Sequence, residues 1–137
     1  MIQIKYLNLL MFLLPFISFR ALSQDQDSIF YTKKIHTKVD VMPQFPGGFD
    51  SLIKYQKKNL KCPDRAKRKK IDASVYVIFI VNRMGIVDST NAIVRVSKEC
   101  DQEALRLIRS LPRFKPGMIN GVRVNTSMEW RVKFDCY

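Results

Sequence analysis

The sequence predicts an α+β domain in which two helices cover one face of a three-stranded antiparallel sheet. Residues 122–136 alternate between apolar and polar side chains over fifteen positions, which is the period of a half-buried strand. Residues 73–81 are apolar at odd and even positions alike, as expected of a central strand. Between these segments, residues 99–111 carry apolar side chains at helical spacing. The expected order along the chain is helix, strand, strand, helix, strand.

Length and composition indicate one folded domain behind a short leader. The chain has 137 residues, of which 47% are hydrophobic, enough for one modest core. Residues 1–23 combine a basic start, a short apolar run and a small-residue cleavage-like step, which is typical of a secretory signal peptide. A short membrane anchor is the alternative. Residues 24–40 are polar and mixed in charge and predict a flexible tether, so the domain is expected at 41–137.

The first part of the domain is expected to be an arm followed by a helix. Residues 41–48 contain two prolines and a glycine pair, which favour an extended segment with a sharp turn. Phe49, Leu52 and Ile53 then begin the apolar stripe of a helix. That helix ends before Pro63, which starts a second, short helical turn.

The remaining elements fix the expected order of the strands. Strand 73–81 turns at residues 82–85 into a second strand, residues 86–96. The helix at 99–111 then forces a crossover, and the right-handed rule places the last strand beside the first. The sheet order is therefore expected to be 2-1-3, with strand 122–136 at an edge. Because this strand is too long to be paired throughout, either it bends or part of its edge is free for another chain.

Charge is concentrated on the first helix and the segment after it. Without residues 1–23 the chain keeps 22 basic and 12 acidic residues, a net charge of +10, because only two cations and no acid are removed. The basic patch comprises Lys54, Lys57, Lys58, Lys61, Arg65, Lys67, Arg68, Lys69 and Lys70. Such a patch suits an anionic polymer or membrane surface, whereas export argues against nucleic acid. A solvated helix face without a ligand is the simpler explanation.

Catalytic chemistry is not indicated. The only histidine, His36, lies in the expected tether, and the glycines form no phosphate-binding motif. The three cysteines contain no C-x-x-C pair, which leaves neither a zinc ribbon nor a thioredoxin-type redox pair. We therefore predict that the protein is not an enzyme and needs neither metal nor cofactor.

The domain resembles the carboxy-terminal domain of the TonB family of energy transducers, in the form common in bacteria of the Bacteroides type. The residues that carry the resemblance are Val41-Met-Pro-Gln-Phe-Pro-Gly-Gly48, Pro63, Ala66, Val75-Tyr-Val, Phe79, Val81, Gly85, Asp101-x-Glu103-Ala104, Phe114-x-Pro116-Gly117, Gly121 and Phe134. Three features depart from the family pattern: Cys62 replaces a tyrosine, Asp72-Ala73 replaces a glycine, and a long proline-rich linker is missing.

The resemblance implies a function in transport across the outer membrane. It implies that the last strand captures a short extended segment of an outer-membrane receptor, the TonB box, by strand addition. The side chains expected to tune the capture are Arg123, Asn125, Ser127, Glu129, Arg131 and Lys133. The domain would lie in the periplasm, either exported or anchored to the inner membrane. A retained anchor would allow coupling to a proton-driven motor, and a homodimer through the edge strand stays open. The alternative hypothesis is an envelope protein that binds an anionic polymer or surface through its basic helices.

The cysteines carry one further expectation. The topology brings Cys62, Cys100 and Cys136 to the same end of the domain. Cys62 and Cys100 both stand where the family usually has bulkier apolar residues, which suggests a Cys62–Cys100 disulfide. Three small buried apolar side chains are the alternative.

Overall fold

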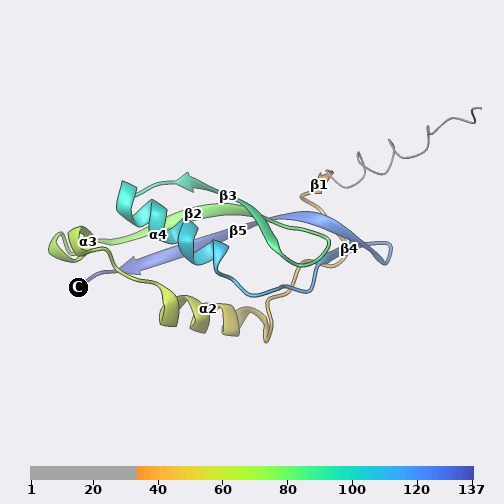
Figure 1. Ribbon diagram of the computed structural model, residues 1–137, viewed down its shortest axis with the longest axis horizontal. Helices are drawn as coiled ribbons and strands as arrows, with labels where there is room; N and C mark the ends of the chain where they lie inside the picture. Colours follow the sequence, from red (N-terminus) through yellow and green to blue (C-terminus); the bar gives the residue numbers. More distant parts are fainter. Residues whose placement is uncertain (1–33) are drawn as a thin grey trace, which may run out of the picture.

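The computed structural model describes residues 34–137, and Figure 1 shows its architecture. The expected signal peptide or anchor, residues 1–23, and most of the expected tether lie outside the described residues. The sheet runs the length of the domain. One end carries α3 (Asp64–Arg68) and the carboxyl terminus, and the other carries β1 (Ile35–His36) and β4 (Gly117–Ile119).

The strand β2 (Asp72–Val81) lies between the two other long strands. It pairs antiparallel with β3 (Val87–Val94) on one side and with β5 (Val122–Asp135) on the other. The β2 side chains at odd positions from Val75 to Val81 are buried, and those at even positions from Ser74 to Ile80 are partly exposed. The core therefore lies on one face of the sheet, and the other face meets solvent.

Two short strands complete the sheet, so the prediction of three antiparallel strands is wrong. β1 runs parallel to β5 opposite Asn125 and Thr126. β4 forms an antiparallel hairpin with the first residues of β5. Strands of two and three residues are too short to show a period in the sequence. Because β1 lies within the segment 24–40 expected to be a tether, the ordered part of the domain begins earlier than predicted.

Three helices, rather than two, pack against the buried face. They are α2 (Gly48–Asn59), the five-residue α3, and α4 (Lys98–Arg109). Leu52 of α2 and Ala66 of α3 join the same core as the buried stripe of α4, which includes Ala104 and Leu107. Ser97 caps α4, since its hydroxyl accepts the Cys100 N–H at 3.2 Å.

Glu103 fastens α4 to the end of α2. Its carboxylate accepts the backbone N–H of Lys61 at 2.8 Å and two guanidinium N–H groups of Arg106 at 2.7 Å. Partial burial by itself raises the pKa of Glu103, but the hydrogen bonds from Arg106 and Lys61 outweigh burial, and the net pKa is lowered. This carboxylate is therefore structural and ionised at neutral pH.

An aromatic cluster holds the proline-glycine arm against the sheet. The ring of Phe45 lies 5.8 Å from that of Tyr55 and 5.6 Å from that of Phe114. Phe114 in turn packs 6.1 Å from Phe79 of β2. Backbone hydrogen bonds between Gln44 and Lys115 fix the arm in place. These contacts explain why the arm is extended and why it delivers the chain to α2 at a defined point.

The cysteines pair differently from the prediction. Cys62 and Cys136 form the disulfide, with their Cα atoms 5.8 Å apart, and Cys100 is free and buried. The Cys62–Cys100 expectation is therefore wrong. Cys136 lies on the apolar side of the alternation, and its N–H bonds to Ile71 O at 2.9 Å. This places its sulfur on the core side, beside the connection between α2 and α3, where Cys62 lies.

Candidate functional site

The outer edge of β5 is paired at one point and open beyond it. It is covered where β1 pairs with residues 125 and 126. β4 pairs with residues 122–124 on the opposite side of the strand, which is the side of β2. From Ser127 to Asp135, no strand among residues 34–137 pairs with the outer edge. At residues 125 and 126, the outer edge of the last strand is thus already occupied within the domain. The remaining nine residues, Ser127–Asp135, form what we call the open edge.

The hydrogen-bond pattern shows which backbone groups the open edge presents. Cys136 and Ile71 are direct partners in the continuing β2–β5 register, and the Cys136 N–H donates to Ile71 O. In an antiparallel ladder, hydrogen-bonded pairs alternate with pairs whose N–H and C=O point away. Even-numbered residues of β5 therefore bond to β2. The outward groups belong to odd-numbered residues, among them Glu129, Arg131 and Lys133.

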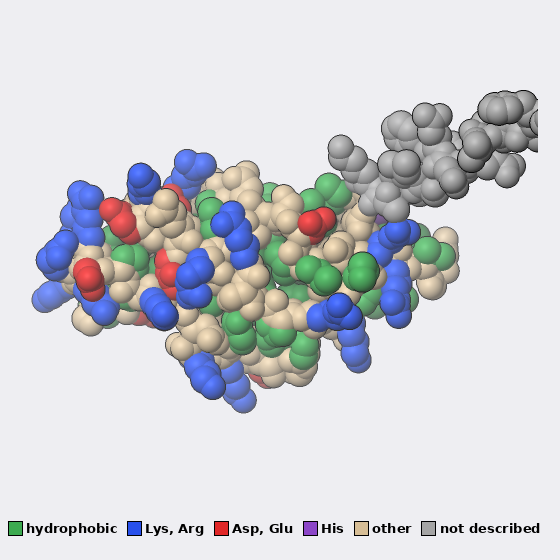
Figure 2. Space-filling model, viewed as in Figure 1, with side chains coloured by type: hydrophobic (Ala, Val, Ile, Leu, Met, Phe, Trp, Pro, Cys, Tyr) green, Lys and Arg blue, Asp and Glu red, His purple; other side chains and the backbone are tan. Residues whose placement is uncertain are grey.

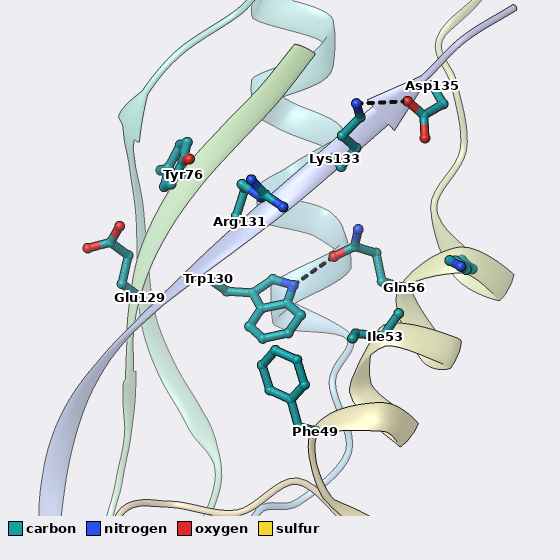
Figure 3. A pocket seen from close by; sticks show the side chains of 10 residues that line it. Phe49, Ile53, Gln56, Tyr76, Glu129, Trp130, Arg131, Lys133 and Asp135 are labelled. Atoms are coloured by element: carbon teal, nitrogen blue, oxygen red, sulfur yellow. Dashed lines mark hydrogen bonds and ion pairs between the residues drawn. The ribbon is translucent and has the colours of Figure 1, made fainter. Parts of the chain in front are cut away.

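A groove of about 530 Å³ runs beside the open edge, and Figure 3 shows it from close by. One wall is α2, which contributes Phe49, Ile53, Gln56 and Lys57. The opposite side is β5 itself. The Phe49 ring meets Trp130 edge to face, with centroids 5.2 Å apart, and the Trp130 Nε1–H donates to Gln56 Oε1 at 2.7 Å.

Among the residues of the first helix, Phe49 departs most from the orientation that the sequence predicts. The sequence puts it on the apolar stripe of the first helix, but its side chain is 66% exposed, while Leu52 is buried. The helix presents two faces: Leu52 and Tyr55 point to the core, and Phe49, Ile53 and Gln56 point to the groove. The spacing of one helical turn between Phe49 and Ile53, and again between Ile53 and Gln56, is the signal that could have revealed this second face.

Charged side chains at the carboxyl end of the open edge neutralise one another. Lys133 Nζ lies 2.7 Å from Asp72 and 3.3 Å from Asp135. The hydrogen bond from Lys133 lowers the pKa of Asp72, and the hydrogen bond to Asp72 raises the pKa of Lys133. Within residues 34–137, Arg131 and Glu129 form no ion pair and stay available to a partner.

The six residues expected to tune capture divide into two groups. Ser127, Glu129, Arg131 and Lys133 lie on the open edge. Asn125 pairs with Ile35 of β1, so the outer edge is already occupied at that residue, and Arg123 lies opposite Met118 of β4. The Asn125 amide also accepts the Arg83 N–H at 3.0 Å.

The predicted basic patch is exposed throughout. It comprises Lys54, Lys57, Lys58, Lys61, Arg65, Lys67, Arg68, Lys69 and Lys70. Arg65 reaches Glu99 at 3.4 Å, and the others form no ion pair within the described part of the chain. In Figure 2, Lys and Arg side chains surround the end of the domain that carries α3, and others lie below α2.

Within residues 34–137, no helix has the length and apolar character needed to cross a membrane. In the same residues, no group of three or more His, Cys, Asp or Glu side chains is placed to hold a metal ion.

Comparison with known proteins identifies the family. The model of the "Gram-negative bacterial TonB protein C-terminal" family matches residues 58–136. The chain belongs to the TonB C-terminal family. A solution NMR structure of the Pseudomonas aeruginosa TonB carboxy-terminal domain is similar at 18% identity and a TM-score of 0.43, covering 74% of this chain and 94% of that chain. No curated protein matches the sequence.

Proposed function

We propose that this chain is a periplasmic TonB-like module that captures an extended segment of an outer-membrane receptor, the TonB box, in support of energy-dependent transport. The segment would add as a strand to the open edge of β5. TonB C-terminal domains are non-catalytic, face the periplasm and interact with receptors in TonB-dependent transport. The observation that carries the proposal is the edge from Ser127 to Asp135, which no strand among residues 34–137 pairs, beside an apolar groove.

The backbone alone would hold such a segment weakly. Glu129, Arg131 and Lys133 would each offer one outward N–H and one C=O, and each bond contributes about 0.5–1.5 kcal/mol net. Association costs at least about 4 kcal/mol, which offsets much of that gain. We therefore infer transient capture, strengthened by side chains along the groove.

A proline at Arg131 tests strand addition. Arg131→Pro removes an outward N–H, and proline is tolerated at an edge position whose N–H does not bond within the sheet. The probes are synthetic peptides that tile the amino-terminal periplasmic segments of the TonB-dependent receptors of the same organism, with binding followed by fluorescence anisotropy. Arg131→Pro should lose binding while keeping its circular dichroism spectrum. The matched variant Arg131→Ala, which keeps the N–H, should bind within a few-fold of wild type. Equal binding by the two variants would refute strand addition.

Two further partners belong to this proposal. If residues 1–23 anchor the chain in the inner membrane, a proton-driven motor would pull on the captured segment. If those residues are cleaved, the module would grip the receptor without a direct link to the motor. Amino-terminal sequencing of the mature protein distinguishes the two cases. A homodimer through the open edge would compete with capture, and sedimentation would detect it.

The second candidate function rests on the basic patch. Its nine cations are exposed and nearly all lack an ion-pair partner within residues 34–137, which suits an anionic polymer or membrane surface. Charge reversal at Lys67, Arg68 and Lys69, which lie in α3 and at its end and do not line the groove, should abolish that binding and leave peptide capture nearly intact. Loss of peptide capture in the charge-reversed protein would instead assign the patch to receptor binding.

A further inference from the structure

The groove beside the open edge has the form of a side-chain subsite. Phe49 is 66% exposed although it is a large aromatic residue, and its ring packs against the Trp130 ring at a centroid distance of 5.2 Å. Ile53, one turn further along α2, continues the same wall. An exposed apolar surface beside an unpaired strand is where a bound partner would bury apolar area.

The geometry of an added strand determines which of its side chains would enter this groove. Side chains of directly opposite residues lie on the same face of a sheet. Trp130 and Val132 point to the core side, toward α2, whereas Glu129 and Arg131 point to the outer face together with Tyr76. A residue opposite Trp130 would therefore place its side chain between Trp130 and Phe49. Its neighbour in the segment, opposite Arg131, would face solvent and the guanidinium group.

We propose that the groove selects receptor segments that carry a large apolar residue opposite Trp130 and an acidic residue opposite Arg131. This inference rests on the proposed strand capture and adds the chemistry of the captured segment. Phe49, Ile53 and the Trp130 ring would enclose the apolar side chain, and Gln56 holds the ring in place through its 2.7 Å hydrogen bond.

Charge supports the acidic part of the motif. Lys133 is neutralised by Asp72 and Asp135, whereas Arg131 and Lys57 form no ion pair in the part of the chain that is described. Lys57 lines the groove, and Lys54 and Lys58 of the same helix add to the positive field around it. Glu129 is the one opposing charge in the groove that lacks an ion pair within residues 34–137. A positive field both attracts an acidic segment and speeds its encounter.

The test uses capped heptapeptides with a fluorescent label. The parent is Asp-Val-Asp-Phe-Asp-Val-Asp, in which apolar and acidic residues alternate. One control replaces its Phe by Ala, one scrambles the same residues so that the alternation is lost, one replaces Asp by Asn, and one carries N-methyl groups along its backbone. Affinities are measured by anisotropy. The emission of Trp130, the single tryptophan of the chain, reports whether the groove is occupied.

The protein variants are matched in exposure. Phe49→Ala removes a groove side chain that is 66% exposed, and Met84→Ala removes an apolar side chain that is 62% exposed and lies outside the groove. We expect Phe49→Ala to weaken binding of the parent peptide about tenfold, the loss of roughly one partly buried side chain. The Ala-substituted peptide should bind wild type about tenfold more weakly and should lose little more on Phe49→Ala. Met84→Ala should bind like wild type, and the Asn peptide should bind more weakly than the parent.

The outcomes separate this inference from the proposed function. If the N-methylated peptide fails to bind but the Phe and Ala peptides bind equally to wild type and Phe49→Ala, strand capture stands and the subsite is overturned. If the N-methylated peptide binds like the parent, strand capture itself fails. Equal binding of the scrambled peptide would show attraction by charge alone and would also overturn the subsite. A dimer that is detected by sedimentation and that no peptide dissociates would overturn the subsite as well.

Discussion

Reduction of the Cys62–Cys136 disulfide should lower the free energy of unfolding by about 4 kcal/mol. The two cysteines are separated by 74 positions. The chain-entropy account gives roughly 4.5 kcal/mol for closing a loop of that length in the unfolded chain. Because single domains are stable by only about 5–15 kcal/mol, the reduced protein should approach marginal stability.

The measurement is guanidinium unfolding at neutral pH, with and without a phosphine reductant. The background is Cys100→Ala, which removes the free buried thiol and so prevents exchange. For a domain of this size, the slope of the unfolding free energy is about 2–6 kcal/mol per molar guanidinium, so the midpoint should fall by about 1 M on reduction. Mass spectrometry of each sample establishes whether the bond is present.

Two results would refute the reasoning. The first is equal unfolding midpoints in two samples that mass spectrometry shows to be oxidised and reduced. Equal midpoints would mean that the disulfide does not constrain the unfolded chain as the loop-closure argument requires. A peptide map that joins Cys62 to Cys100 in the wild-type protein would show that the pairing itself is wrong, although the core geometry favours Cys136.

Two further predictions concern stability. Glu103→Gln should make the free energy of unfolding fall less steeply as the pH is lowered. The pKa of Glu103 is lowered on folding, so its carboxylate stabilises the folded protein above the ordinary pKa of 4.5. That contribution is lost as the pH falls through the lower pKa of the folded state. Unfolding curves of both proteins from pH 7 to pH 3 check this, and parallel curves would contradict it. Gly85→Ala should cost about 2 kcal/mol or more, since Gly85 has φ +82° and an added Cβ would meet the backbone carbonyl of Phe114. Gly121→Ala is the control, because Gly121 has φ +75° but an added Cβ there would meet no atom. This substitution should lower the free energy of unfolding by about 1 kcal/mol in the same denaturation assay. Equal losses of stability in the two variants would reject the steric argument.

The long elements were predictable because each repeats its pattern several times. The alternation from Val122 onwards matches β5 at its first residue and extends only one residue beyond its end. The apolar character of both faces of residues 73–81 correctly placed β2 between two strands. The turn at residues 82–85 was predictable because its last position has positive φ, which glycine adopts readily and which Gly85 supplies. In each case local chemistry and tertiary packing favour the same structure.

The remaining features depend on contacts that no local pattern encodes. β1 exists because Ile35 and His36 meet the outer edge of β5, and no periodicity marks two residues. The disulfide depends on which two sulfurs the fold brings together. The alternation already placed Cys136 on the core face, but only the path from α2 to α3 shows that Cys62 faces it. The outward turn of Phe49 depends on the rotation of α2 about its own axis.

The groove and the open edge cannot act independently, since both follow from the alternation of β5. The register that points even-numbered side chains such as Trp130 toward α2 also points the backbone of odd-numbered residues such as Arg131 outward. A captured segment that slipped by one residue would move each of its side chains to the other face of the sheet. It would then lose the apolar contacts of the groove and place its acids against Phe49 and Trp130. The apolar wall on α2 would therefore set the register of capture, which hydrogen bonds to a uniform backbone cannot do alone.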